Sequence, residues 1–117
     1  MPVRSSNSSV LRWPDRETVD AAARRWAQRQ RPLHPGLLRL GYFGSYARGD
    51  WGVGSDLDLI ALVERSDLPF RDRPLQWDLA ELPVPAEIAV YTAEEWRRLE
   101  RERSRFAATI RAEAVWL

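Results

Sequence analysis

Two short motifs contain the residues whose types and spacing are best suited to binding a phosphate and a metal ion. The first is Gly44-Ser45, which follows an apolar run, and the second is Asp56-Leu57-Asp58, which begins eleven residues after Ser45. The first backbone N–H groups of a helix have no partner within the helix, so a small Gly-Ser opening leaves room for a phosphate to dock against them. Together, a phosphate-sized turn and a pair of carboxylates predict phosphate and metal chemistry at one place.

The two aspartates are predicted to share one face of a strand. Because side chains alternate along a strand, Asp56 and Asp58 point to one side while Leu57 and Leu59 point to the other. Two adjacent carboxylates repel, and without a cation at least one is pushed towards protonation. Mg²⁺ prefers oxygen ligands and commonly takes one or two carboxylates plus substrate phosphates. The sequence therefore predicts a Mg²⁺ site.

Apolar runs on either side of the motifs predict the elements that position them. Residues 37–43 and 57–63 are apolar enough for buried strands. A helix is expected to open at Gly44-Ser45, where the Ser45 hydroxyl can cap it or bond a phosphate oxygen. Three glycines between residues 49 and 55 predict a loop before the second strand.

These residues resemble a known family. The strings Phe43-Gly44-Ser45 and Asp56-Leu57-Asp58-Leu59 are similar to the signature of the DNA polymerase β-like nucleotidyltransferase superfamily, and residues 43–63 most resemble its small prokaryotic branch, the minimal nucleotidyltransferases. The resemblance implies an α/β (α+β) fold, a small mixed β-sheet flanked by helices. It also implies transfer of a nucleoside monophosphate from an NTP to a hydroxyl, with one or two Mg²⁺ ions and loss of pyrophosphate.

The resemblance assigns catalytic and metal-binding roles to Asp56 and Asp58, and it requires a third carboxylate on a neighbouring strand. Glu87 is the only acid in the strand-like run 84–91. Most members carry aspartate in the matching place, and glutamate is one methylene longer. Glu87 either helps to hold the catalytic metal or accepts the proton of the attacking hydroxyl, as the resemblance implies, or it is a surface acid.

The candidate nucleotide-binding residues are Gly44, Ser45, Arg48 and Ser55. Arg48 lies one helical turn beyond Ser45, so it either binds a triphosphate as a fork of donors or forms a surface ion pair with Asp50 or Glu64. Ser55 either bonds a phosphate or the neighbouring carboxylate, or caps a turn.

Composition excludes several classes of site. The net charge of +1 argues against a dedicated nucleic-acid binder. All 18 basic residues are arginine, which excludes a Walker-type phosphate loop and Schiff-base chemistry, and the absence of cysteine excludes thiolate sites.

His34 is expected to be a solvated loop residue, and Trp51 is either a platform for a nucleobase or partner, or a loop anchor. With no membrane-spanning run and no signal peptide, we expect a cytoplasmic protein.

Length and composition predict one domain over residues 1–117, and the resemblance implies that it is a nucleotidyltransferase domain. Within it, residues 1–9 are expected to be flexible, 10–31 to contain a helix, and 37–91 to form the motif-bearing core. Residues 92–117 are expected to form helices and a last edge strand from Val115 onwards, and 74–80 a short helix.

A chain of this length has no room for a domain that grips the acceptor. The acceptor must therefore be held by a partner or a second copy of the chain, or be the partner itself. The resemblance implies AMP transfer from ATP to a tyrosine of a helical HEPN-type partner, as the antitoxin of a HEPN/MNT pair. The alternatives are a module that neutralises such a partner without transferring anything and, ranked third, nucleotidylation of an antibiotic or another small molecule.

Overall fold

The computed structural model describes residues 13–117, so the flexible segment expected over 1–9 lies outside the described residues. Within the described part, one sheet has the order β3-β2-β1-β4. β1 is antiparallel to β2 and β4, whereas β2 and β3 are parallel. The mixed sheet confirms the predicted fold class. The bounds of the strands are β1 Leu37–Phe43, β2 Leu57–Val63, β3 Ala86–Thr92 and β4 Val115–Trp116.

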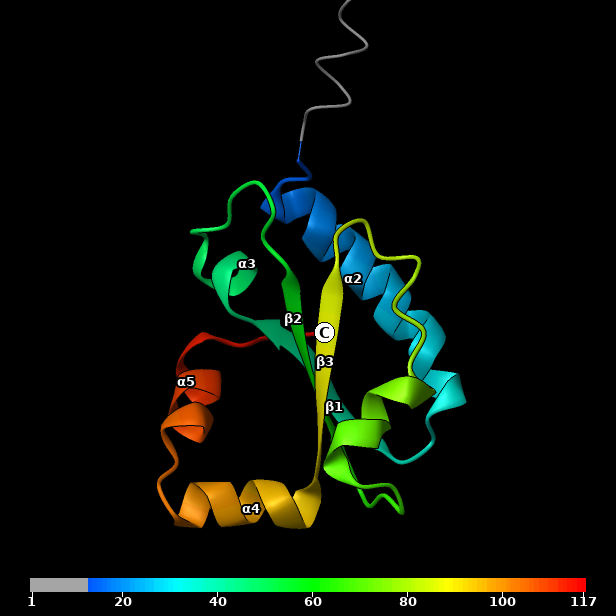
Figure 1. Ribbon diagram of the computed structural model, residues 1–117, viewed down its shortest axis with the longest axis vertical. Helices are drawn as coiled ribbons and strands as arrows, with labels where there is room; N and C mark the ends of the chain where they lie inside the picture. Colours follow the sequence, from blue (N-terminus) through cyan, green and yellow to red (C-terminus); the bar gives the residue numbers. More distant parts are fainter. Residues whose placement is uncertain (1–12) are drawn as a thin grey trace, which may run out of the picture.

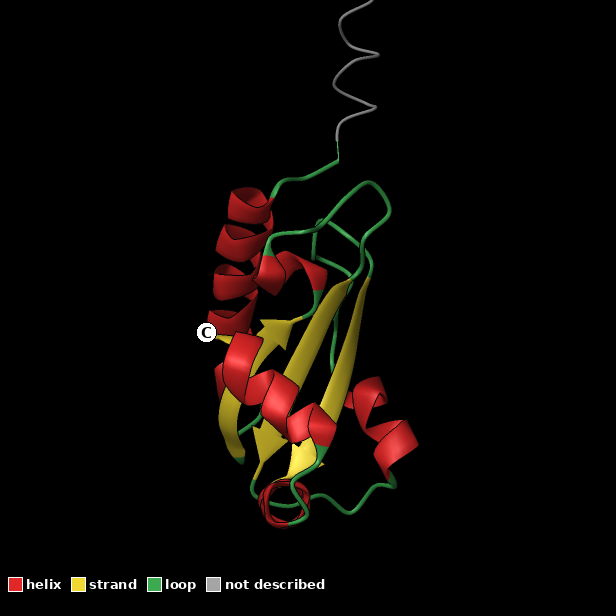
Figure 2. Cartoon of the chain, turned by 90° about the vertical axis from the view of Figure 1, so that its left-hand side faces the viewer, coloured by secondary structure: helices red, strands yellow, loops and turns green. Residues whose placement is uncertain are grey.

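Helices surround this sheet. In Figure 1, α2 runs along one side of the strands, while α4 and α5 lie on the other side and at one end. Figure 2 shows the same strands crossing the middle of the molecule with helices packed around them. The α-helices are α2 Arg16–Gln30, α3 Ser45–Arg48, α4 Ala93–Arg101 and α5 Arg105–Glu113, and the 3-10 helices are η1 Arg31–Leu33 and η2 Phe70–Gln76.

Local capping explains where the longer helices begin. The Asp15 side chain accepts a hydrogen bond from the Thr18 N–H at 2.8 Å and so caps α2. Thr92 and Glu95 form a reciprocal capping box that opens α4, and Ser104 caps α5. Each cap satisfies a backbone N–H that lacks a partner within its helix.

Strand alternation separates two clusters of buried side chains. In β2, Leu57 and Leu59 are 0% and 1% exposed and join the larger cluster, to which α2 contributes Val19 and Trp26. Ile60 belongs instead to a smaller cluster with Leu62 and Ile110. Successive residues of one strand therefore face two different environments, as the period of two requires.

The short helix predicted over 74–80 is wrong in position. A 3-10 helix is present, but it spans Phe70–Gln76, and Trp77 is already extended. The reason is tertiary: the Trp77 ring packs 6.0 Å from that of Trp26, and the Asp78 carbonyl accepts a hydrogen bond from the Trp26 indole at 2.7 Å. These contacts need extended backbone after residue 76.

Candidate active site

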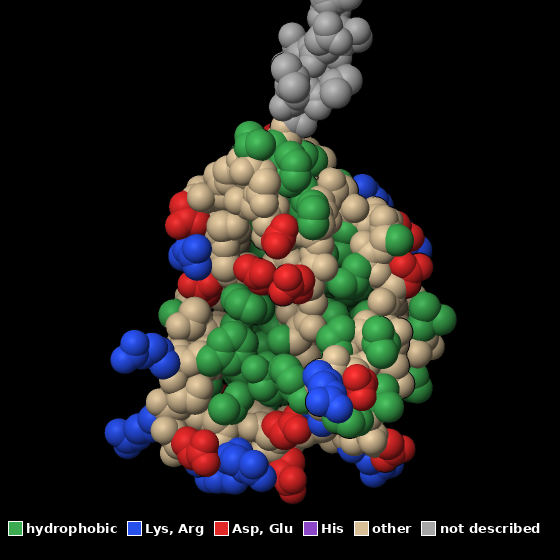
Figure 3. Space-filling view, in the orientation of Figure 1, with side chains coloured by type: hydrophobic (Ala, Val, Ile, Leu, Met, Phe, Trp, Pro, Cys, Tyr) green, Lys and Arg blue, Asp and Glu red, His purple; other side chains and the backbone are tan. Residues whose placement is uncertain are grey.

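Asp58 and Glu87 lie side by side at the starts of two parallel strands. Asp58 is the second residue of β2, and its register partners are Phe43 on β1 and Glu87 on β3. Neighbouring strands are about 4.8 Å apart, so the two side chains are close neighbours. Asp56 is exposed and precedes β2. Figure 3 shows acidic side chains gathered over the starts of β2 and β3, directly above an apolar area.

The concentration of negative charge alters the titration of Asp58. Burial raises the pKa of this carboxyl, and repulsion from Glu87 and Asp56 raises it further. The Arg48 guanidinium acts in the opposite direction and lowers the pKa of Asp58. A cation bound beside these carboxylates would reduce the repulsion between them.

The turn before α3 is built on glycine for a steric reason. Gly44 is buried with a φ of +80°, a conformation that side chains rarely adopt. A Cβ at this position would also collide with the carboxylate of Asp58. The turn and the β2 carboxylate are therefore packed directly against each other, although fourteen residues separate them along the chain.

Ser45 does not cap the helix that it opens. It is the first residue of α3, and the N-cap position belongs to Gly44, which has no side chain to donate or accept. The expectation that Ser45 caps the helix is therefore wrong, because a cap must precede the first helical residue. Its half-buried side chain stays a candidate for contact with a phosphate.

Arg48 forms ion pairs within the chain. Its Nε donates to Asp50 at 3.1 Å and its Nη1 to Glu113 at 3.3 Å. The alternative partner, Glu64, lies just after the far end of β2, whereas Arg48 is at the opposite end. The guanidinium remains about half exposed, at 49%, so it is accessible from solvent.

The glycine-rich loop is held by its own side chains. The Ser55 hydroxyl accepts a hydrogen bond from the Gly52 N–H at 2.8 Å, so Ser55 caps the turn. Trp51 stacks on Tyr46 with ring centroids 5.7 Å apart and an angle of 6° between the planes. This stacking is the arrangement of a loop anchor, and it fastens the loop to α3.

Sequence reasoning missed Glu113, the last residue of α5. Its Oε2 accepts a hydrogen bond from the Gly44 N–H at 2.7 Å as well as the one from Arg48. Its carboxylate also raises the pKa of Asp58, which places it beside the other acids. The one useful signal in the sequence was the edge strand predicted after it, because a strand beside β1 brings the end of α5 to the turn.

The candidate metal ligands at this site offer the type of donor atom that a hard divalent cation prefers. Asp56, Asp58 and Glu87 supply only carboxylate oxygens, the ligands that Mg²⁺ prefers. Over residues 13–117, however, no three acidic or histidine side chains are arranged as ligands of a single ion. The donor chemistry therefore fits Mg²⁺, while these side chains are not gathered around one point.

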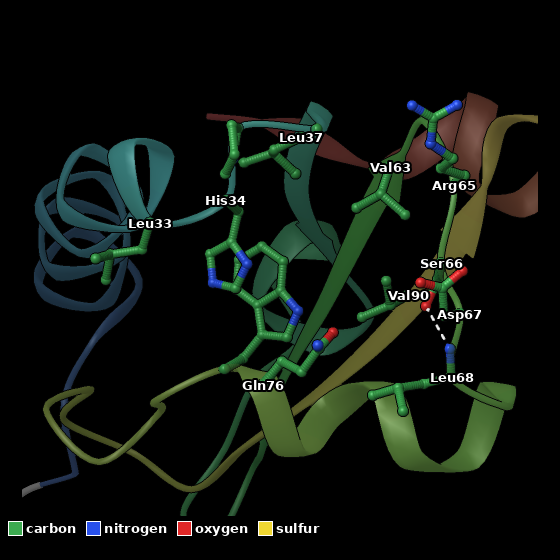
Figure 4. A pocket seen from close by; sticks show the side chains of 13 residues that line it. Leu33, His34, Leu37, Val63, Arg65, Ser66, Asp67, Leu68, Gln76 and Val90 are labelled. Atoms are coloured by element: carbon green, nitrogen blue, oxygen red, sulfur yellow. Dashed lines mark hydrogen bonds between the residues drawn. The ribbon is translucent and has the colours of Figure 1, made fainter.

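A cavity of about 600 Å³ lies at the other end of the sheet, away from these carboxylates. Leu37, Val63 and Val90 line it from three neighbouring strands (Figure 4). His34 also lines it and stacks on Trp77 with centroids 3.6 Å apart. The expectation of a solvated histidine is therefore wrong, since the ring is half-buried and burial lowers its pKa.

No helix within the described residues has the length and apolar character needed to cross a membrane.

Comparison with known proteins agrees with this geometry. A family model described as "Nucleotidyltransferase domain" matches residues 23–112, a segment that contains both motifs and Glu87. The structure is similar to the crystal structure of a candidate nucleotidyltransferase from Sulfolobus solfataricus, with a TM-score of 0.60 and 18% identity over 98% of this chain and 87% of that one. At this identity the likeness shows the fold. Comparison with the curated proteins gives no match.

The matched segment is well over half of the 117 residues. The match and the shared fold are consistent with the minimal nucleotidyltransferase branch. The chain therefore belongs to the nucleotidyltransferase domain family, a family of transferases that act on an NTP and generally use a divalent metal.

Proposed function

We propose that this protein transfers AMP from ATP to a hydroxyl group of a partner protein in a Mg²⁺-dependent reaction. The observation that carries the proposal is the contact between the Gly44 turn and Asp58, with Glu87 beside Asp58 in register on β3. This contact puts the turn that the sequence predicts to bind phosphate next to the carboxylates. Transfer of a nucleotidyl group needs both.

Each residue then has a defined role. Asp56 and Asp58 would hold the Mg²⁺, which when bound neutralises phosphate charge and polarises a phosphoryl oxygen. Ser45 and Arg48 contact the phosphates and orient the triphosphate, Arg48 as a charged fork of donors. Glu87 accepts the proton of the attacking hydroxyl.

The reaction balances without any further reactant. The acceptor oxygen forms a bond to the α-phosphorus, the bond from that phosphorus to the bridging oxygen of the β-phosphate breaks, and pyrophosphate leaves. The hydroxyl proton passes to the carboxylate of Glu87, whose exposed position allows it to reach an external acceptor. The proposed acceptor is a HEPN-type partner, with an antitoxin role for this protein, as the resemblance implies.

A binding role without catalysis is the second candidate. It is favoured by the spread of the carboxylates, because no three acidic groups in residues 13–117 are arranged around one ion. The longer side chain of Glu87, compared with the usual aspartate, favours it too. In this role the chain binds and neutralises the partner and leaves it unmodified.

Incubation of the purified protein with labelled ATP, Mg²⁺ and the HEPN-type partner separates the two roles. Transfer of label should fall by about 10² or more in Asp56→Ala and in Asp58→Ala. Asp67→Ala is the matched control, because Asp67 is an exposed acid beyond the far end of β2 and should retain full activity. The enzymatic proposal would be wrong if the wild-type protein transfers no label while both variants still bind the partner.

A further inference from the structure

Glu113 connects the C-terminal helix to the candidate active site. It is the last residue of α5, and its carboxylate accepts hydrogen bonds from the Gly44 N–H at 2.7 Å and from Arg48 Nη1 at 3.3 Å. Its side chain is only 18% exposed. The carboxylate thus bridges two of the candidate nucleotide-binding residues, which are 69 and 65 positions away along the chain.

The backbone of Gly44 needs such a partner. The residue is buried in a positive-φ conformation, and a buried N–H that lacks a hydrogen bond is destabilising, because it has lost its hydrogen bond to water without replacing it. Within the described residues, Glu113 is the acceptor that this N–H has. Hydrogen bonds to a charged acceptor are roughly twice as strong as neutral ones, so this contact holds the turn firmly.

The position of Glu113 is itself constrained. Two residues later the chain enters β4, where Val115 and Trp116 pair with Tyr42 and Gly41 of β1. A Cβ at residue 41 would meet the Trp116 ring at 2.7 Å, so β4 seats closely on that strand. Because β4 pairs with β1, the Glu113 carboxylate lies near the end of β1, where the Gly44 turn begins.

Glu113 also determines which way Arg48 points. The guanidinium is shared between Asp50 and Glu113, and Asp50 lies further along the glycine-rich loop. Without Glu113, the ion pair with Asp50 would be left and would draw the guanidinium towards the loop. With it, the guanidinium is held beside the turn, because the same Glu113 oxygen also accepts the hydrogen bond from the Gly44 N–H.

We propose that Glu113 is a positioning residue for the nucleotidyl transfer: it holds the Gly44 turn and Arg48 in the orientation in which they receive the triphosphate. The kinetic consequence rests on the proposed function, whereas the effect on the turn rests on the hydrogen bonds alone. Glu113 acts through its two partners and needs no contact with the reacting atoms.

Amide hydrogen exchange followed by NMR tests the effect on the turn without any need for activity. Exchange at the Gly44 N–H should accelerate by about tenfold or more in Glu113→Ala. Glu113→Gln keeps an acceptor without the charge and should give an intermediate increase. Glu100→Ala is the matched control, because Glu100 also pairs with an arginine of α5, Arg111 at 3.2 Å, and should leave Gly44 unchanged.

Steady-state kinetics with the HEPN-type partner test the effect on the reaction. Glu113→Ala should raise the KM for ATP by about tenfold with a smaller change in kcat, because the turn and Arg48 contact the nucleotide. Glu113→Gln should recover part of the loss. A merely structural role would lower the active fraction and therefore kcat while leaving KM unchanged.

Three results would overturn the proposal. The first is amide exchange of Gly44 in Glu113→Ala at the rate found in the Glu100→Ala control. The second is a fall in kcat of Glu113→Ala with no change in KM. The third is tighter ATP binding by Glu113→Ala, which would mean that the Glu113 carboxylate competes with the nucleotide. If Glu113→Ala fails to fold, the same exchange and kinetic measurements on Glu113→Gln test the proposal. A wild-type protein that binds ATP but transfers nothing contradicts the proposed function. In that case the exchange data still test whether Glu113 holds the Gly44 turn.

Discussion

The two faces of the sheet are built in contrasting ways. On one face, α2 covers the larger cluster, which has fifteen buried members, with Trp26, Leu57 and Tyr42 at 0–1% exposure, and nine half-buried apolar residues packed against it. On the other, Ile60, Leu62 and Ile110 form a small buried centre. Half-buried side chains surround that centre: Phe43, Tyr91, Trp96, Phe106, Ala114 and Trp116.

Asp58 follows the strand alternation onto the second, thinly covered face. It has the same parity in β2 as Ile60, and Glu87 has the same parity in β3 as Tyr91. In Figure 3 the acidic group stands directly above the apolar area between the strands and α5. The larger buried cluster therefore lies on one face of the sheet, whereas Asp58 and Glu87 lie on the face with the smaller one.

Trp26→Ala should have the largest effect on stability. Removing a fully buried tryptophan should lower the free energy of unfolding by about 4 kcal/mol, because it leaves a cavity and deletes the indole hydrogen bond to Asp78. Phe106→Ala on the second face should cost about half as much, since its ring is only half-buried. Urea denaturation measures both, and equal losses would contradict the contrast between the faces.

Tyr42→Phe should have a smaller effect on the covered face, about 1–2 kcal/mol in the free energy of unfolding. The Tyr42 hydroxyl donates to Asp20 of α2 at 2.6 Å, and burial together with Asp20 raises its pKa to about 12. The bond contributes in full below pH 10 and is lost as pH rises from 10 towards 12, because the unfolded tyrosine ionises first. The difference between wild type and Tyr42→Phe in urea midpoint should therefore shrink over that range.

Asp58→Asn should have the smallest effect on stability, and of opposite sign. Because the folded state raises the pKa of Asp58, its charged form opposes folding above the ordinary value of 3.8 and does so less as pH falls. The variant should be slightly more stable than wild type at pH 7, by less than about 1 kcal/mol given solvent screening, and equal to it near pH 3. Thermal melts at the two pH values measure this, and a destabilised variant at pH 7 would show that the carboxylate is structurally required.

Much of the fold could be predicted because its causes are local. The runs 37–43 and 57–63 are strands in the structure at those bounds, and the edge strand expected from Val115 onwards pairs with β1. The helix misplaced at 74–80 failed because the Trp26–Trp77 contact overrides local preference there. The candidate site could be predicted as far as its motifs, because each motif is a short run of adjacent residues, whereas Glu113 is 69 positions beyond Gly44 and reaches the site only through the fold.

The sequence by itself determined which side chains are available for chemistry: a Gly-Ser pair and two aspartates with apolar neighbours on alternate sides, in a chain without lysine or cysteine. These properties follow from residue type and from the fixed period of a strand. Only the tertiary structure decided that Glu87 stands in register with Asp58, that Arg48 is shared with Glu113, and that the acids lie on the less covered face. Strand order and helix docking set those contacts, and both depend on the packing of the whole chain.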